Sequence, residues 1–200
     1  MSEATFYLFK ALLDIFTVGV VLNFLFRLFK VDYFNPIVQG IVRAVDYPSQ
    51  FLRSFLRPIY SIDFATLIVA ILIQSAAFYL AVVAGSITYD PVKISIWSLY
   101  SVIILCLKVS FWLMLGGIVI SWVASDNNHP AIKLLMQMAD SIFAPFRYII
   151  PPMGGLDISP IFAFIALRYL ESVFTSFASA SGMPYSVSYT HLTLPTIRMV

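Results

Sequence analysis

Four long apolar stretches limit what this chain can fold into more than any other feature. They cover about residues 6–29, 64–87, 96–123 and 158–179. A helix that crosses a bilayer needs about 20 predominantly apolar residues, because the hydrocarbon core is about 30 Å thick. Inside lipid, a helix satisfies its own backbone N–H and C=O groups. We therefore predict an all-α membrane protein with four transmembrane helices.

The composition supports a membrane protein. Hydrophobic residues make up 60% of the 200 residues and charged residues only 11%, whereas a soluble domain is typically about 25% charged. The 18 Phe, 11 Tyr and 3 Trp suit helices that face lipid and carry aromatic residues at the interface. The first apolar stretch is too long for a signal-peptide core, so we expect it to span the membrane. The lipid bilayer is thus the expected partner, and a net charge of +2 predicts no nucleic acid binding.

The chain aligns with itself, without a gap, at an offset of 94 residues. The identities are Asp32 with Asp126, Pro36 with Pro130, Asp46 with Asp140, Arg53 with Arg147, Pro58 with Pro152 and Asp63 with Asp157. Two spans in each copy keep both copies in the same orientation, so the repeat is parallel. We predict a first repeat over 1–94 and a second over 95–183.

Each repeat also predicts an amphipathic helix between its two spans. In 36–46 the apolar residues fall on one helical face and the polar residues on the other. The pairs Asn35-Pro36 and His129-Pro130 each predict an N-cap followed by proline in the first turn. Two placements fit this pattern: a helix lying on the membrane surface, or a helix packed on the ends of the spans.

Basic residues predict the orientation. They gather in 30–63 and 124–157, whereas the connection between the second and third spans holds only Lys93. Positive residues favour the cytoplasmic side. We therefore expect segments 30–63 and 124–157 to be cytoplasmic and both termini to be periplasmic, in a bacterial inner membrane.

The stretch PPMGGLDISP over 151–160 predicts a sharp turn from the membrane surface into the fourth span. Its two prolines stop a preceding helix, and Gly154 and Gly155 permit positive φ. Asp157 is expected to cap the fourth span. The first copy keeps Pro58 and Asp63 but lacks the glycines.

These residues carry a resemblance to a known family. The second-repeat pattern closely resembles the signature of the YggT family of integral membrane proteins, related to the YlmG proteins; it comprises Arg147, Pro151, Pro152, Gly154, Gly155, Asp157, Ser159 and Pro160. The first repeat is similar to that of a two-repeat proteobacterial member, with equivalents at Asp32, Asn35, Pro36, Arg53, Pro58 and Asp63. The resemblance covers about residues 5–182. It implies a link to osmotic-stress tolerance in bacteria, and for plastid and cyanobacterial relatives a link to cytochrome maturation and to nucleoid or division organisation.

Placing polar side chains within a membrane span costs free energy, so such residues need a structural or functional reason. Those singled out are Asp14, Gln74, Lys108, Arg168 and Glu171; the first span also carries Lys10 and Arg27. Asp14 and Lys108 are equivalent at the offset of 94 and could pair if the first and third spans pack together. Arg168 and Glu171 could pair three residues apart on one helix. Such groups either hold the bundle together, line an ion or proton path, or reach to the interface.

The sequence predicts no enzyme: we find no catalytic residue, no cofactor site and no metal site. Cys106 is expected to be a small buried apolar residue, and His129 to cap a helix or face solvent. The prediction is a non-catalytic helical scaffold that supports osmotic-stress tolerance or membrane-protein assembly, with other membrane proteins or copies of itself as possible partners. The alternative is a small transporter or channel subunit for ions or osmolytes.

The last residues differ in character from the rest of the chain. From about 184–188 onward the sequence resembles a translated sequencing adapter, ending in SVSYTHLTLPTIRMV. We therefore treat 184–200 as a non-native tail and give His191 no functional role.

Overall fold

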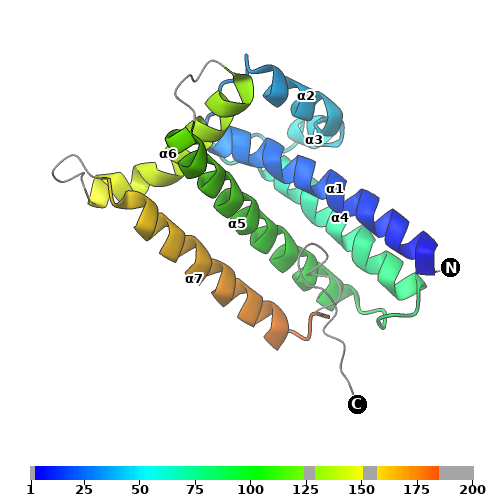
Figure 1. Cartoon of the computed structure of the whole chain (residues 1–200). Helices are drawn as coiled ribbons and strands as arrows, with labels where there is room; N and C mark the ends of the chain where they lie inside the picture. Colours follow the sequence, from blue (N-terminus) through cyan, green and yellow to red (C-terminus); the bar gives the residue numbers. More distant parts are fainter. Residues whose placement is uncertain (1–2, 124–128, 151–156, 185–200) are drawn as a thin grey trace.

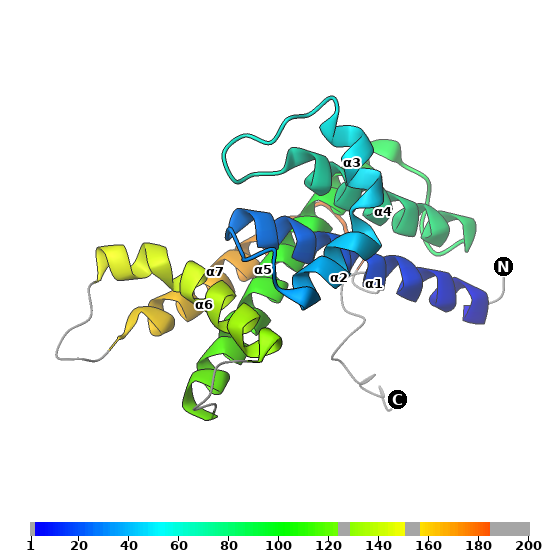
Figure 2. The same cartoon turned by 90° about the horizontal axis from the view of Figure 1, so that it is seen from above.

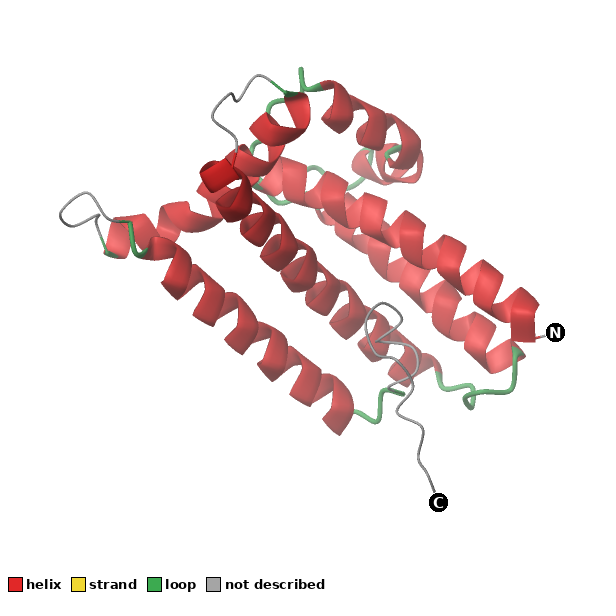
Figure 3. Cartoon of the chain, viewed as in Figure 1, coloured by secondary structure: helices red, strands yellow, loops and turns green. Residues whose placement is uncertain are grey.

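The computed structural model describes residues 3–123, 129–150 and 157–184. The described residues form seven helices and no strand (Figure 3). They are α1 (Glu3–Leu28), α2 (Pro36–Val45), α3 (Tyr47–Arg53), α4 (Phe64–Val83), α5 (Pro91–Val123), α6 (Pro130–Ile149) and α7 (Ser159–Ala180). The helices α1, α4, α5 and α7 are long and apolar enough to cross a membrane. The predicted all-α architecture with four spans is confirmed.

The four long helices run side by side, and α2, α3 and α6 gather at one end of them (Figures 1 and 2). Within the first repeat α1 packs on α4, and within the second α5 packs on α7. The two repeats meet where α4 and α1 pack on α5 and where α2 contacts α6. Equivalent helices thus make equivalent contacts, as a parallel repeat predicts.

A large cluster of buried apolar residues lies near the end of the bundle that carries the short helices. Val20 and Val21 of α1, Val38 of α2 and Met138 of α6 are fully buried in or beside one cluster. Ile37, Ile41 and Val42 of α2 pack against the same cluster. The apolar face of α2 therefore packs on the ends of the spans, as one of the two predicted placements requires.

The segment between the spans differs between the repeats. In the first repeat it breaks into α2 and α3 at Asp46, two residues before Pro48. Proline lacks the N–H that would continue the α2 hydrogen-bond ladder, and its ring clashes with the preceding turn. In the second repeat Ile142 stands at the position of Pro48, and α6 runs on through Asp140.

Two of the three predicted N-caps are present, and Asp63 supplies one that was not predicted. Asn35 Oδ1 accepts the Ile37 N–H at 2.9 Å and His129 Nδ1 accepts the Ala131 N–H at 3.2 Å, each just before a proline. Asp63 is the N-cap of α4. Asp157 is not the N-cap of α7, because Ile158 holds that position; its carboxylate nevertheless accepts the Ser159 N–H at 2.9 Å. The cap therefore sits one residue later than predicted.

Two predictions fall outside the described residues. The double-glycine turn with Pro151, Pro152, Gly154 and Gly155 lies in 151–156, and the non-native tail lies almost wholly in 185–200.

Candidate functional site

Each repeat holds one arginine between two aspartates at the end of the bundle that carries the short helices. The first clamp comprises Asp46, Arg53 and Asp63; the second clamp comprises Asp140, Arg147 and Asp157. The members of the two clamps are equivalent at the offset of 94 residues. The duplicated charges seen in the sequence therefore form one duplicated structure.

In the first clamp the Arg53 guanidinium uses most of its donors. It donates Nη1 and Nη2 to the two carboxylate oxygens of Asp46, at 2.7 and 2.5 Å, and Nε to Asp63 Oδ2 at 2.8 Å. A further bond runs from Nη2 to the Thr66 hydroxyl at 3.0 Å. Such bidentate hydrogen bonds between arginine and a carboxylate are stronger and more specific in geometry than hydrogen bonds between neutral groups.

The second clamp repeats the geometry with fewer bonds. Arg147 Nε donates to Asp157 Oδ2 at 2.7 Å, and Arg147 Nη1 donates to Asp140 Oδ1 at 3.0 Å. The Arg147 guanidinium also lies over the Phe143 ring, 5.4 Å from its centroid. The same nitrogen, Nε, meets the second aspartate of both clamps.

The two clamps differ in how far their side chains are buried. The side chains of Asp46, Asp63 and Arg53 are 7%, 1% and 16% exposed, whereas those of Arg147 and Asp140 are 38% and 62% exposed. Ion pairs near water contribute little to stability, whereas removing one member of a buried pair leaves an uncompensated charge. The first clamp is therefore the one that the fold depends on.

Further side chains surround the first clamp. Asn23 Nδ2 donates to Asp46 Oδ1 at 2.7 Å, and the Thr66 hydroxyl donates to Asp63 Oδ2 at 2.7 Å. Arg27 lies 3.2 Å from Asp63 and 3.6 Å from Asp46. Burial acts to raise the pKa of the Asp46 carboxyl, but the hydrogen bonds from Arg53 and Asn23 outweigh it and hold that pKa below its usual value. Asp46 is therefore ionised at neutral pH.

The repeat explains why the second clamp lacks these partners. At the positions of Asn23 and Arg27 the second repeat has Gly117 and Ser121. A Cβ on Gly117 would lie 2.4 Å from the Ala139 Cβ. Where the first repeat places a hydrogen bond, the second places α6 directly against α5.

The clamps connect the short helices to the spans. Asp46 lies at the junction of α2 and α3, Arg53 is the last residue of α3, and Asp63 caps α4. In the second repeat Asp140 and Arg147 belong to α6, and Asp157 precedes α7. Each clamp therefore holds the chain at the point where it turns from the short helices into the second span.

Hydrogen bonds also join the two repeats at this end. Asn35 Nδ2 donates to the Pro130 carbonyl at 2.7 Å, and the Asp32 N–H donates to Gln137 Oε1 at 3.1 Å. Ser141 Oγ donates to the Phe29 carbonyl at 3.3 Å. The short helices of both repeats therefore form one connected layer.

Neighbouring side chains satisfy most of the polar residues within the spans. Arg168 and Glu171 pair at 2.7 Å, as predicted. Asp14 pairs at 2.6 Å with Lys10, one turn earlier on α1, and the proposed pairing of Asp14 with Lys108 stays a prediction. Gln74 Nε2 donates to the Thr17 hydroxyl at 3.3 Å.

The equivalent contact in the second repeat has different chemistry. Arg168 takes the position of Gln74 and Phe111 that of Thr17, and the Arg168 guanidinium lies 5.3 Å from the Phe111 ring centroid. A hydrogen bond in one repeat thus corresponds to a cation–π contact in the other.

Sequence reasoning found some clamp members and missed others. Arg53, Asp63, Arg147 and Asp157 were expected as motif positions, but their joint contacts were not. Asp46 and Asp140 stood out only as repeat identities, and the roles of Asn23, Arg27 and Thr66 were missed. The usable signal was the recurrence of acid, base and acid at the same spacing, seven and then ten residues apart, in both copies.

The fold and the clamps define a class: a helical membrane protein built from two parallel repeats. The chain matches the CCB3/YggT family twice, over residues 2–84 and 96–178. It belongs to this family, with one family unit in each repeat.

Three relatives are similar to this chain over most of their length. Protein PA0392 of Pseudomonas aeruginosa is 35% identical over 195 residues, covering 94% of this chain and 97% of the relative. YggT of Escherichia coli strain K12 is 28% identical over 186 residues, covering 91% and 94%. A Vibrio alginolyticus protein encoded in the proC 3' region is 29% identical over 166 residues, covering 82% and 89%. All three are described as uncharacterized, and no solved structure matches.

Proposed function

We propose that this protein is a non-catalytic scaffold of the bacterial inner membrane that supports osmotic-stress tolerance or the assembly of other membrane proteins. The observation that carries the proposal is the duplicated clamp. In each repeat it joins the short helices to the ends of the spans through ion pairs, buried in the first repeat and half-exposed in the second, which is a structural task.

The polar residues within the spans support the same proposal. Asp14 with Lys10, and Arg168 with Glu171, form neutral pairs within single helices. Gln74 bonds a neighbouring helix. A transport path would need polar groups that face a shared passage, whereas these three contacts satisfy the groups where they lie.

The layer of short helices is the surface that such a scaffold offers. Arg43 of α2 and Lys133 of α6 are exposed on it, and segments 30–63 and 124–157 together carry half of the twelve Lys and Arg residues. By the positive-inside rule we place this layer in the cytoplasm and both termini in the periplasm. Other membrane proteins, or further copies of the chain, would bind there.

The test is growth after hyperosmotic shock in a deletion strain complemented with variants. Arg147→Gln removes a half-exposed clamp residue, so the protein should insert at the wild-type level but fail to restore growth. The matched control is Lys93→Gln, which breaks an exposed 3.7 Å pair with Asp90 at the opposite end and should restore growth fully. Immunoblots of the membrane fraction check protein levels.

Two results would contradict the proposal. Full growth with Arg147→Gln together with failure of Lys108→Ala, at normal protein levels, would favour the transporter reading. A deletion strain that tolerates the shock as well as wild type would remove the link to osmotic stress.

A further inference from the structure

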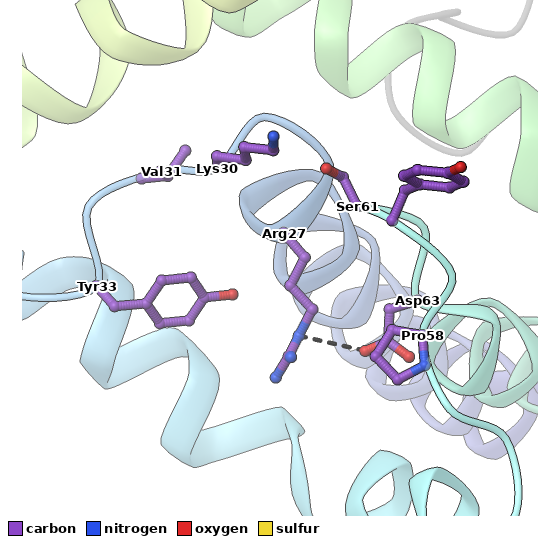
Figure 4. A pocket seen from close by; sticks show the side chains of 8 residues that line it. Arg27, Lys30, Val31, Tyr33, Pro58, Ser61 and Asp63 are labelled. Atoms are coloured by element: carbon purple, nitrogen blue, oxygen red, sulfur yellow. Dashed lines mark ion pairs between the residues drawn. The ribbon is translucent and has the colours of Figure 1, made fainter.

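A pocket of about 390 Å³ lies beside the first clamp, where α1 ends and α4 begins (Figure 4). It is lined by Arg27, Lys30, Val31, Tyr33, Pro58, Tyr60, Ser61 and Asp63. The lining combines two cations with three hydroxyl groups. Its volume is in the range of small-molecule sites.

The charges of the pocket favour an anion. The one acid in the lining, Asp63, is already met by Arg53 at 2.8 Å and Arg27 at 3.2 Å. The two arginines balance the carboxylates of Asp63 and Asp46. Lys30 is exposed and has no ion-pair partner within the described part of the chain, so it adds one uncompensated positive charge.

The pocket also contains hydrogen-bond donors that a ligand could use. Arg27 approaches Asp63 and Asp46 at ion-pair distance, but its side chain makes no hydrogen bond among the described residues. A guanidinium carries five N–H donors. Burial raises the pKa of the Tyr33 phenol above its usual value, although Arg27 acts to lower it. The phenol therefore remains protonated and can donate.

The side chains are arranged around a shared space. Figure 4 shows the Arg27 side chain between Tyr33 and Asp63, with Lys30 and Ser61 on the other side of the pocket. The Arg27 guanidinium carbon lies 5.9 Å from the Tyr33 ring centroid. A small anionic group can therefore be approached by donors from two sides.

The backbone is strained at two positions in the lining. Lys30 and Tyr60 have φ of 52° and 54°, and they are the non-glycine residues with positive φ in the described part of the chain. Lys30 follows α1, where the Val31 N–H donates to the Phe26 carbonyl at 2.9 Å, and glycine usually takes this place. Tyr60 aligns with Gly154 of the second repeat. Such strain gathers at functional sites, where the side chain is needed despite its backbone.

The position of the pocket points to lipid. It lies at the ends of two membrane-spanning helices, where tyrosines such as Tyr33 and Tyr60 meet the head groups. Basic pockets between transmembrane helices on the cytoplasmic side bind anionic head groups. We propose that this pocket binds the phosphate of an anionic phospholipid head group, with Arg27 and Lys30 as the cations and Tyr33, Tyr60 and Ser61 as hydroxyl donors. The proposal rests on the cytoplasmic placement of this end given under the proposed function, but not on the scaffold role.

The second repeat lacks the same side chains. Ala124, Asn127 and Gly154 stand at the positions of Lys30, Tyr33 and Tyr60. The sequence therefore assigns one such site to each chain, in the first repeat.

The test measures the melting temperature of the full-length protein in detergent against added lipid. Phosphatidylglycerol should raise it in a saturable way, whereas phosphatidylcholine and inorganic phosphate should not. Lys30→Gln should weaken the apparent affinity for phosphatidylglycerol about tenfold, the effect of losing one hydrogen bond to a charged group. The matched control is Arg43→Gln, an exposed basic residue outside the pocket lining, which should bind like wild type.

A second variant separates binding from folding. Lys30→Gly relaxes the left-handed backbone, so its melting temperature without lipid should equal or exceed that of wild type, while its affinity for phosphatidylglycerol should fall as in Lys30→Gln. Wild-type affinity in either variant would overturn the proposal. Equal stabilisation by phosphatidylcholine would also overturn it, and full stabilisation by inorganic phosphate alone would assign the site to a free anion instead.

Discussion

Replacing Arg53 with glutamine is expected to lower the free energy of unfolding by about 3 kcal/mol or more, as for one member of a buried ion pair. The change leaves the buried carboxylates of Asp46 and Asp63 with Arg27 as their remaining cation. The side chain of Asp63 is 1% exposed, so water cannot take over the lost bonds. The measurement is a reversible unfolding titration in mixed micelles.

The second repeat supplies a matched control. Arg147→Gln removes the equivalent residue from a half-exposed clamp and should cost less than about 1 kcal/mol. Arg53→Lys keeps the charge but loses the planar fork, so its loss should fall between the two. Equal losses for Arg53→Gln and Arg147→Gln would show that burial does not decide the strength of the clamps.

Adding one methyl group at Gly117 is expected to lower the free energy of unfolding by about 1–3 kcal/mol, as for other overpacked contacts. The new Cβ would lie 2.4 Å from the Ala139 Cβ and 3.1 Å from the Leu135 carbonyl oxygen. Because the second of these is backbone, α6 must move away from α5. The same unfolding titration measures the change.

Gly116→Ala is the control on the same turn of α5. Its Cβ would first meet Leu135 Cδ2 at 3.7 Å, an ordinary contact. Removing a glycine from a helix interior stabilises it by about 0.5–1 kcal/mol, so this variant should be as stable as wild type or more so. A Gly117→Ala variant as stable as Gly116→Ala would mean that α5 and α6 are not in close contact.

The sequence predicted the architecture well because its signals are strong and local. Apolar runs long enough to span a membrane leave few alternatives to a helix. The caps at Asn35 and His129 were predictable because a polar residue followed by proline favours the start of a helix. The parallel repeat was visible as identities at one offset, and it gave the equivalence of the helices.

The clamps were harder to predict from the sequence because they depend on tertiary contacts. Arg53 and Asp63 are ten residues apart, and no helical periodicity brings them together; the turn over 54–62 does. Asn23 and Arg27 come from α1, more than 15 residues earlier in the chain than Asp46, and their second-repeat equivalents are not polar partners of the same kind. The position of Asp157 was predicted one residue too close to α7, since helix boundaries depend on the backbone turn before them.

We infer that the first clamp, and not the lipid surface, holds α2 and α3 on the ends of the spans. The most direct test is amide hydrogen exchange of α3 and of residues 54–62, in wild type and in Arg53→Gln, with each protein in lipid nanodiscs and in detergent. We predict that α3 is protected in wild type in both environments, and that Arg53→Gln exchanges at least about tenfold faster there, the effect of losing about 1.4 kcal/mol of local stability. If α3 of Arg53→Gln stays as protected from exchange as α3 of wild type in nanodiscs, the membrane, and not the first clamp, holds α3 in place.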